Sequence, residues 1–284
     1  GLARADIQAV GSHNSYKIAL PAPELALIAA SDAEAAAGLD YAHLPLTEQL
    51  DLGMRQLELD LFHDPEGGRY ADPLLPRLTA GQDGARAFDP APMRSPGFKT
   101  FHTQDIDVWS HCPVFIDCLR EIEAWSDANP DHAPLLVLLN LKTGSIPVPG
   151  STAALDFTPE AFDAMDAEIL SVFEPDDLIV PDDVRGEAES LRAAVLAGGW
   201  PSLAQARGRI VFALDTGAAN VETYLRGARS LEGLPVFVNS LSEDADHAAY
   251  FTMNDPLAEA DRIRAAVEAG FLVRTRSDAK TVEA

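Results

Sequence analysis

Residues 54–64 read MRQLELDLFHD, and their alternation of leucine with polar residues predicts a β-strand over residues 54–62. Side chains two positions apart on a strand point to the same face, so Glu58 and Asp60 share one face and leucines occupy the other. Burying unpaired carboxylates is costly, so a positive charge is expected beside them. That charge is either a divalent ion with oxygen ligands or the Arg and Lys partners of an ordinary sheet strand.

The composition indicates one folded domain spanning residues 1–284. The chain is 47% hydrophobic and 23% charged, which allows a large core and excludes a disordered composition. Its formal net charge of −24 excludes nucleic acid as a partner and opposes tight docking on anionic bilayers. The sequence has no apolar run of the roughly 18 residues that a membrane span needs. We expect a monomer.

The first residue and the cysteines bear on location. The sequence begins at Gly1 without a Met, which suggests a processed precursor and a secreted or periplasmic protein. Cys112 and Cys118 are compatible with a disulfide in such a compartment, provided that Cys112 lies outside the helix that follows it. Two free, partly buried thiols are the equal alternative. Zinc is excluded because the spacing is wrong and the chain has no further cysteines.

Strands and helices are expected to alternate along the chain. We expect strands at residues 7–10, 54–62, 98–101, 135–141, 209–214, 235–238 and 270–274, with weaker ones at 178–180 and 250–252. We expect helices at residues 21–38, 47–52 (N-cap Thr47), 113–129, 158–173 (N-cap Thr158) and 256–269. This order predicts an α/β fold, a single TIM-type (β/α) barrel whose form need not be regular, with an open doubly wound sheet as the competitor. No nucleotide-binding glycine motif supports the competitor.

Residues 65–97 form a long excursion without periodicity, of the kind that is often functional. Leu74, Leu75, Met93 and Phe98 are its candidate membrane-facing side chains. The alternative is that these four residues pack beneath the loop.

Polar residues that suit phosphodiester chemistry follow the first four expected strands. They are His13 and Asn14, Glu58 and Asp60, His102, and Asn140 with Lys142. In a barrel these groups would converge on one mouth. Amide and carboxylate oxygens suit Ca²⁺ or Mg²⁺, two imidazoles suit general acid–base catalysis, and a lysine suits an anionic ester.

Several motifs together resemble a known family. They are Gly11-Ser12-His13-Asn14-Ser15-Tyr16, Gln49-Leu50, Gly53-x-Arg55, Leu57-Glu58-Leu59-Asp60, Cys118-Leu119-Arg120, the stretch 125–130 and the ending Arg274-Thr275-Arg276-x-Asp278. This set resembles the X-type barrel of phosphatidylinositol-specific phospholipases C, and most closely the calcium-dependent secreted bacterial branch. The resemblance covers residues 7 to 284.

The resemblance implies a role for each matching residue. It implies that His13 and His102 are the acid–base pair, and that Asn14, Glu58 and Asp60 bind calcium, with magnesium less favoured. Asn140 stands where the branch usually has an acidic ligand, so the fourth ligand would contribute no charge. Lys142 resembles a phosphate-binding lysine. Arg274 and Arg276 share a strand face and would either pair with acids or contact inositol or phosphate, and Asp215 receives no firm role.

The implied activity is calcium-dependent cleavage of phosphatidylinositol to diacylglycerol and a cyclic inositol phosphate, with transient contact to a membrane surface. A glycerophosphodiester phosphodiesterase is the first alternative, because residues 139–142 resemble the L-E-I-K strand of that family. A barrel that binds inositol lipid or sugar without turnover is the second, and Asn140 is its best support. A glycosidase that uses Glu58 and Asp60 is the third, although carboxylates on one strand face more often form one ligand cluster.

Overall fold

The structure, a computed structural model, describes residues 7–279 and 282–283. Its main sheet is parallel and runs in the order β1 (Gln56–Phe62), β2 (Leu135–Lys142), β3 (Ile210–Asp215) and β4 (Phe237–Val238). A parallel bridge from Asn239 to Tyr250 continues the sheet to β5 (Tyr250–Thr252), which pairs with β6 (Leu272–Arg274). At the opposite edge, Gly11 pairs in parallel with Gln56. The expected TIM-type barrel is therefore confirmed.

The barrel is irregular because it has a seam. Within the described ranges, no backbone bridge joins β6 to the first chain segment, residues 7–13. The first segment instead follows β1, through hydrogen bonds from Arg55 N to Val10 O and from Ser12 N to Gln56 O. A Cβ atom on Gly11 would lie 2.3 Å from Gln56 Oε1, so only glycine permits this close approach.

Alternation along β1 determines which side chains enter the barrel. Leu57, Leu59 and Leu61 are fully buried and belong to the main core, together with the apolar stripe of α5 (Phe115–Ala128). Glu58 and Asp60 take the opposite face, and both are buried as well. The strand is thus buried on both faces, as expected in a parallel barrel.

In the described structure, four helices of the barrel lie where they were predicted: α3 (Leu46–Asp51), α5, α6 (Pro159–Leu170) and α11 (Ala260–Glu268). Four others were not predicted: α7 (Pro181–Arg185), α8 (Leu191–Leu196), α9 (Leu203–Ala206) and α10 (Ala218–Leu225). Thr158 caps α6 by accepting from Ala161 N, as predicted. The prediction of Thr47 as an N-cap was wrong: α3 begins one residue earlier, after Pro45, and the Thr47 side chain donates to Glu121 instead.

The predicted helix over residues 21–38 is two helices, α1 (Ala22–Ser31) and α2 (Ala33–Leu39). Asp32 separates them because its extended backbone ends α1, while its carboxylate accepts from Ala35 N and caps α2.

The predicted barrel strand over residues 98–101 was wrong. Lys99 forms antiparallel bridges with Phe62 and Val114, so this segment crosses the end of β1 and does not extend the parallel sheet. Its buried ammonium explains the course of the chain: it donates to the carbonyls of Ser95 and Gly97 and lies 3.6 Å from Asp64. A lysine tied in this way fixes the segment as a loop.

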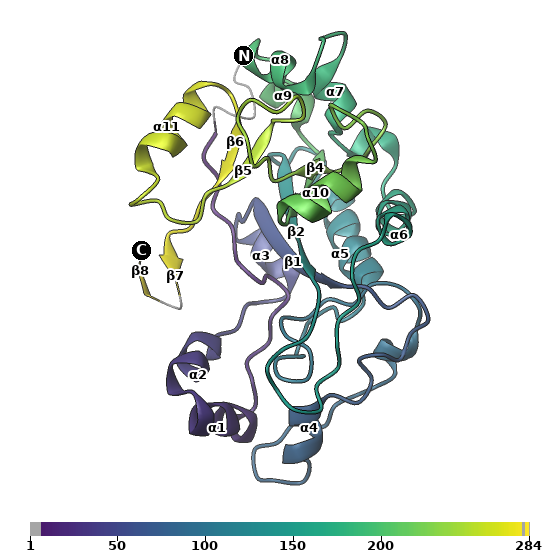
Figure 1. Ribbon diagram of the computed structural model, residues 1–284, viewed down its shortest axis with the longest axis vertical. Coiled ribbons are helices and arrows are strands. Elements are labelled where there is room, and N and C mark those ends of the chain that lie inside the picture. Colours follow the sequence, from purple (N-terminus) through teal and green to yellow (C-terminus); the bar gives the residue numbers. More distant parts are fainter. Residues whose placement is uncertain (1–6, 280–281, 284) are drawn as a thin grey trace.

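Residues 17–45, 63–112 and 143–157 gather at the carboxyl ends of the strands, and we call them the loop lobe. In Figure 1 the lobe lies below the barrel and carries α1, α2 and α4 (Leu74–Thr79). A second apolar cluster, separate from the barrel core, stabilises it. This cluster comprises Phe62, Tyr70, Met93, Phe101, Val108 and Ala154.

The excursion over residues 65–97 contains α4 and the short 3₁₀ helix Pro92–Arg94, neither of which periodicity indicated. Leu75, Met93 and Phe98 are buried. Packing beneath the loop is therefore correct for these three residues, whereas Leu74, the fourth candidate, is only half-buried. Among the described residues, no helix is both long and apolar enough to span a bilayer.

Cys112 and Cys118 form a disulfide, with Cα atoms 5.2 Å apart. The geometric condition for this bond is met because α5 begins at Phe115 and leaves Cys112 in the preceding loop. The bond fastens the end of the loop lobe to the first turns of the helix that packs on the barrel.

Candidate active site

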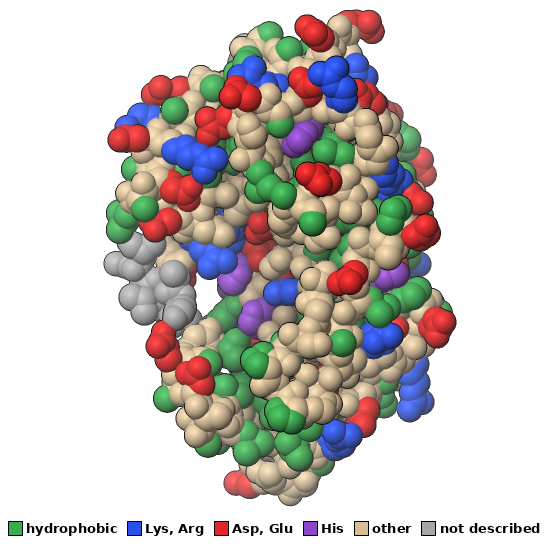
Figure 2. All heavy atoms as spheres, in the orientation of Figure 1, with side chains coloured by type: hydrophobic (Ala, Val, Ile, Leu, Met, Phe, Trp, Pro, Cys, Tyr) green, Lys and Arg blue, Asp and Glu red, His purple; other side chains and the backbone are tan. Residues whose placement is uncertain are grey.

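A hollow lies between the barrel and the loop lobe, and histidine, basic and acidic side chains gather in it (Figure 2). The strand register explains part of this gathering. Asp60, Asn140 and Asp215 are direct neighbours across β1, β2 and β3, near the carboxyl ends of these strands. Asn140 is half-buried, while Asp60 is fully buried. The convergence predicted from the ends of the strands is therefore present in the structure.

Both carboxylates of β1 have cationic neighbours. Arg274 donates to Glu58 Oε2 at 2.6 Å and also donates to Asn254. Lys142 Nζ lies 2.8 Å from Asp60 Oδ2. Burial raises the pKa of Glu58; Arg274 opposes this shift, and the carboxylate of Asp60 adds to it. Of the roles left open for Arg274, pairing with an acid is the one that the structure contains.

Asn14 owes its position to an unusual backbone. Its φ is +53°, a left-handed conformation that asparagine tolerates better than most residues. Its amide donates to Tyr41 Oη at 2.7 Å, and its Oδ1 accepts from Tyr16 Oη at 3.3 Å. Two tyrosines thus orient an amide oxygen that keeps a second lone pair for another partner.

His13 lies where the first segment, β1 and the residues after β6 meet. Its Nε2 is 3.3 Å from Glu58 Oε1 and 3.3 Å from a guanidinium nitrogen of Arg276. A guanidinium can only donate to Nε2, whereas a carboxylate can only accept from it, so these two contacts favour opposite tautomers of the His13 ring. Burial lowers the pKa of His13 to about 3, and the charges of Arg276, Arg274, His102 and Lys142 contribute to this. His102 is thus one of the charged groups whose field acts on the His13 ring.

His102 belongs to the loop lobe and has a different set of partners. Its Nδ1 lies 3.0 Å from Asp107 Oδ2, and a carboxylate can only accept, so Nδ1 carries the proton. Lys17 Nζ lies 3.0 Å from the same oxygen, and both Lys17 and Asp107 are fully excluded from solvent. The chain Lys17–Asp107–His102 therefore fixes the ring and leaves Nε2 free.

Sequence reasoning missed Asp107 and Lys17. Asp107 follows His102 by five residues in a segment without periodicity, and Lys17 is 90 positions from Asp107. The available signal was local. A carboxylate follows a histidine by five residues, and a lysine comes directly after the His13-to-Tyr16 motif. That signal does not show that the two charges meet.

The donor set fits a calcium ion. Asn14, Glu58, Asp60 and Asn140 supply only oxygen ligands, two of them carboxylates, as a hard cation prefers. Both oxygens of Asp60 are buried and neither accepts a hydrogen bond of good geometry, so Lys142, which pairs with Oδ2, is the neighbour with which a bound ion would share this carboxylate. Among the described side chains, no cluster of three His, Cys, Asp or Glu groups suits a metal, because half of this donor set is amide.

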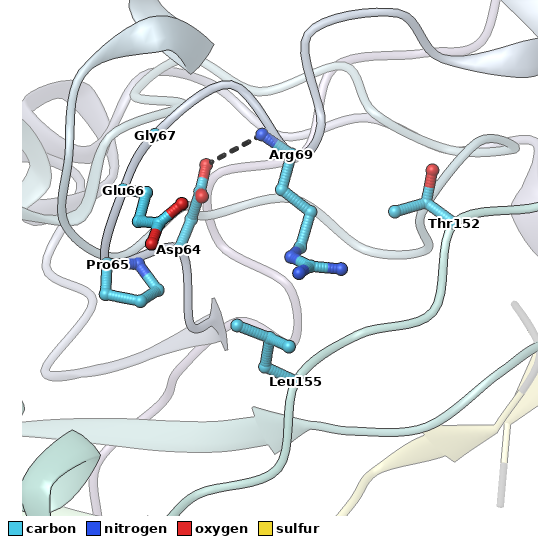
Figure 3. A pocket seen from close by; sticks show the side chains of 7 residues that line it. All are labelled: Asp64, Pro65, Glu66, Gly67, Arg69, Thr152 and Leu155. Atoms are coloured by element: carbon cyan, nitrogen blue, oxygen red, sulfur yellow. Dashed lines mark hydrogen bonds between the residues drawn. The ribbon is translucent and has the colours of Figure 1, made fainter.

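A second cavity, of about 410 Å³, lies within the loop lobe and does not include the histidines. It is lined by Asp64, Pro65, Glu66, Gly67, Arg69, Thr152 and Leu155 (Figure 3). Arg69 N donates to Asp64 Oδ2 at 3.3 Å, and Lys99 neutralises that carboxylate from the buried side. Asp64 and Arg69, whose guanidinium donates to Ala153 O, already have partners, and the cavity contains no histidine, so the hollow at His13 and His102 is the candidate active site.

A model of the family described as phosphoinositide phospholipase C, Ca²⁺-dependent, matches residues 2–284. No curated protein sequence matches the chain. The solved structures that share its fold include two calcium-dependent phospholipases C. One is a calcium-dependent phosphoinositol-specific phospholipase C from Pseudomonas sp in a myoinositol complex, with 17% identity, a TM-score of 0.62 and coverage of 98% of this chain and 84% of that one. The other is a Ca²⁺-dependent phosphatidylinositol-specific phospholipase C from Streptomyces antibioticus, with 20% identity, a TM-score of 0.56 and coverage of 96% and 82%.

Proposed function

Because the chain belongs to the family of Ca²⁺-dependent phosphoinositide phospholipases C, we propose that it cleaves phosphatidylinositol to diacylglycerol and a cyclic inositol phosphate. The observation that carries this proposal is the pair of imidazoles at one hollow, each with its own partners. Burial and neighbouring basic groups keep the His13 ring neutral and able to accept a proton, and a carboxylate holds His102 at Nδ1 and leaves its Nε2 for the substrate.

The first step is an internal attack on phosphorus. The inositol hydroxyl next to the phosphoester gives its proton to His13 Nε2 as its oxygen bonds to phosphorus. The bond from phosphorus to the glycerol oxygen breaks, and His102, which enters the step with a proton on each ring nitrogen, gives the one on Nε2 to that oxygen. His13 ends protonated and His102 neutral, so proton exchange with water restores both. Hydrolysis of the cyclic product would use the two rings in the opposite roles.

Basic side chains hold the phosphate during this step. Lys142 and Arg276 both face the hollow, and each has one contact that an anionic oxygen can share: Lys142 with Asp60, and Arg276 with His13. Arg274 stabilises Glu58 and so acts on the shape of the site more than on the phosphate.

Calcium would be held by Asn14, Glu58, Asp60 and Asn140. When bound, the ion lowers the pKa of the attacking hydroxyl and neutralises charge on the phosphate. Since Asn140 brings no charge, we expect weaker calcium affinity than four ligands with three carboxylates would give. The disulfide favours an oxidising compartment, which supports a secreted or periplasmic location. A transient contact with the membrane and a monomeric state complete the proposal.

The test compares substrates with and without calcium. We expect cleavage of phosphatidylinositol in Ca²⁺ and its loss in excess chelator. Full activity in chelator would reject the role of the metal. Preference for glycerophosphocholine or glycerophosphoinositol over phosphatidylinositol would instead indicate a glycerophosphodiester phosphodiesterase. Calcium binding without cleavage of any of the three would favour a barrel that binds inositol lipid or sugar without turnover. This is the second candidate because both carboxylates of β1 already have basic partners, Arg274–Glu58 and Lys142–Asp60, and because Asn140 brings no charge.

A further inference from the structure

A groove of about 660 Å³ follows the barrel seam between the first segment and β6. At one end it is lined by active-site residues, namely His13, Arg274 and Arg276. At the other end it reaches the beginnings of β1 and β2 and the side of α11. The groove exists because side-chain contacts, not backbone bridges, link β6 to the first segment in the described structure. It therefore extends the active site along the barrel seam.

The walls of the groove are apolar away from the histidine. They include Val10, Leu136, Ile263, Val267 and Phe271. Val10 is 67% exposed and Val267 is 43% exposed, which leaves apolar surface open to water in a strongly acidic protein. Exposed apolar side chains that border a concave surface are typical of a ligand groove.

The polar part of the groove contains donors without acceptors. Gln56 Nε2 and Arg276 Nε are both buried, and neither has a hydrogen-bond partner. Both residues line the groove. A buried donor without an acceptor is costly, and a ligand with oxygen acceptors would remove that cost. The arginines along the groove also favour a ligand that carries such oxygens.

We propose that the seam groove binds a fatty acyl ester chain of the lipid, with ester oxygen at Arg276 and Gln56 and methylene groups along Val10 and Val267. An acyl ester matches both parts of the groove, because its acceptor oxygens fit the unpaired donors and its methylene chain fits the apolar walls. The inference rests on the proposed function, because only a glycerolipid places its phosphodiester at His13 while an acyl chain starts nearby. The groove would thus make the enzyme sense the diacylglycerol part of its substrate.

The kinetic test uses Val267→Asp, with Leu196→Asp as the matched control. Val267 and Leu196 are 43% and 45% exposed, and Leu196 does not line the groove. A carboxylate in the groove wall must be desolvated against methylene groups. We expect Val267→Asp to raise KM for monomeric dihexanoylphosphatidylinositol about tenfold. It should leave KM for p-nitrophenyl inositol phosphate, which has no chain, within about twofold, and Leu196→Asp should change neither.

A binding measurement separates the groove from the chemistry. Calorimetric titration with monomeric dihexanoylphosphatidylcholine should show binding to the wild-type protein and to Leu196→Asp, and a loss of at least about tenfold in affinity for Val267→Asp. If the wild-type protein cleaves neither inositol substrate, the proposed function fails. The titration still shows whether the groove binds an acyl chain. Failure of the wild-type protein to bind, or equal binding by both variants, would overturn the groove proposal.

A second pair of variants guards against misfolding. Val10 and Leu52 are 67% and 70% exposed, and only Val10 lines the groove. If Val267→Asp loses its native circular dichroism, Val10→Asp against Leu52→Asp repeats both measurements. Equal results for Val10→Asp and Leu52→Asp would likewise contradict the proposal.

Discussion

The barrel and the loop lobe each contribute one histidine to the hollow, and they position it by different means. His13 follows a barrel segment, and strand-borne groups surround it: Glu58 from β1 and Arg276 from the end of β6. His102 lies on a loop, and a buried carboxylate and lysine from other parts of the same lobe hold it. The regular fold thus supplies the charged cavity, and irregular chain supplies the second ring. Variants that change residues in one region at a time test whether the barrel and the loop lobe make these separate contributions.

The largest effect is expected from removing either ring. His13→Ala and His102→Ala should each lower kcat on phosphatidylinositol by about 10²–10⁴-fold, the range for a lost general acid or base. Initial rates of diacylglycerol release with saturating Ca²⁺ measure this.

His63→Ala is the control for these variants. His63 also lies in the loop lobe, but it stacks on Phe98, with ring centroids 5.1 Å apart, and takes no part in the hollow. Its replacement should leave kcat within a few-fold of wild type. A near-native rate for His13→Ala or His102→Ala would remove that residue from the mechanism.

The barrel half of the site was predictable from sequence, and the lobe half only in part. Glu58 and Asp60 could be assigned to one face because strand periodicity is local and strict. The register that places Asn140 beside Asp60 follows from parallel pairing. Lys99 misled the prediction because its burial depends on Asp64 and two carbonyl groups that no period reveals. Asp107 and Lys17 were missed for the same reason, since only tertiary packing brings them together.

The next effect concerns the partners of His102. Asp107→Asn keeps the shape of the side chain but removes the carboxylate that orients the ring, so kcat should fall by about 10- to 100-fold with KM little changed. Asp105→Asn is the matched control in the same loop, because Asp105 accepts from Leu74 N and Thr152 N and does not contact the ring. Equal losses in kcat for both variants would mean that Asp107 only holds the loop.

Lys17→Met tests the buried end of the same chain of contacts. It leaves the Asp107 carboxylate without its ammonium partner and should lower the free energy of unfolding by about 3 kcal/mol in urea titrations. Combining it with Asp107→Asn should recover part of that loss, because the unpaired charge is then absent. A double variant that is less stable than Lys17→Met alone would contradict the assignment of this ion pair.

Reduction of the disulfide gives a smaller effect at the joint between the two regions. The Cys112–Cys118 bond closes a short loop, with a sequence separation of six. Its removal in Cys112→Ser/Cys118→Ser should lower the free energy of unfolding by about 2 kcal/mol. Denaturant titrations with and without a reductant check this, and only the wild-type protein should respond to the reductant.

The smallest effect is expected in the barrel, at the contact of α6 with α10. Burial raises the pKa of Asp166 to about 7, although Tyr224 Oη donates to its Oδ1 at 3.0 Å. The folded protein therefore holds a proton there that the unfolded chain releases near pH 4, so stability falls as the pH rises from about 4 to 7. Asp166→Asn should remove this decline, so the variant should become more stable than the wild type as the pH rises toward 7, with little difference at pH 4. A wild-type and variant difference that does not vary with pH would contradict the raised pKa.

The most direct measurement of the division between the regions compares two leaving groups. Diacylglycerol needs a proton as it leaves phosphorus, whereas p-nitrophenolate does not. His102→Ala should therefore keep a fraction of wild-type activity on p-nitrophenyl inositol phosphate at least about tenfold larger than on dihexanoylphosphatidylinositol. His13→Ala should lose the same fraction on both. Two results would contradict the assignment of His13 in the barrel as the base and His102 in the loop lobe as the acid. One is an equal loss of activity on both substrates for His102→Ala, and the other is a smaller loss on p-nitrophenyl inositol phosphate for His13→Ala.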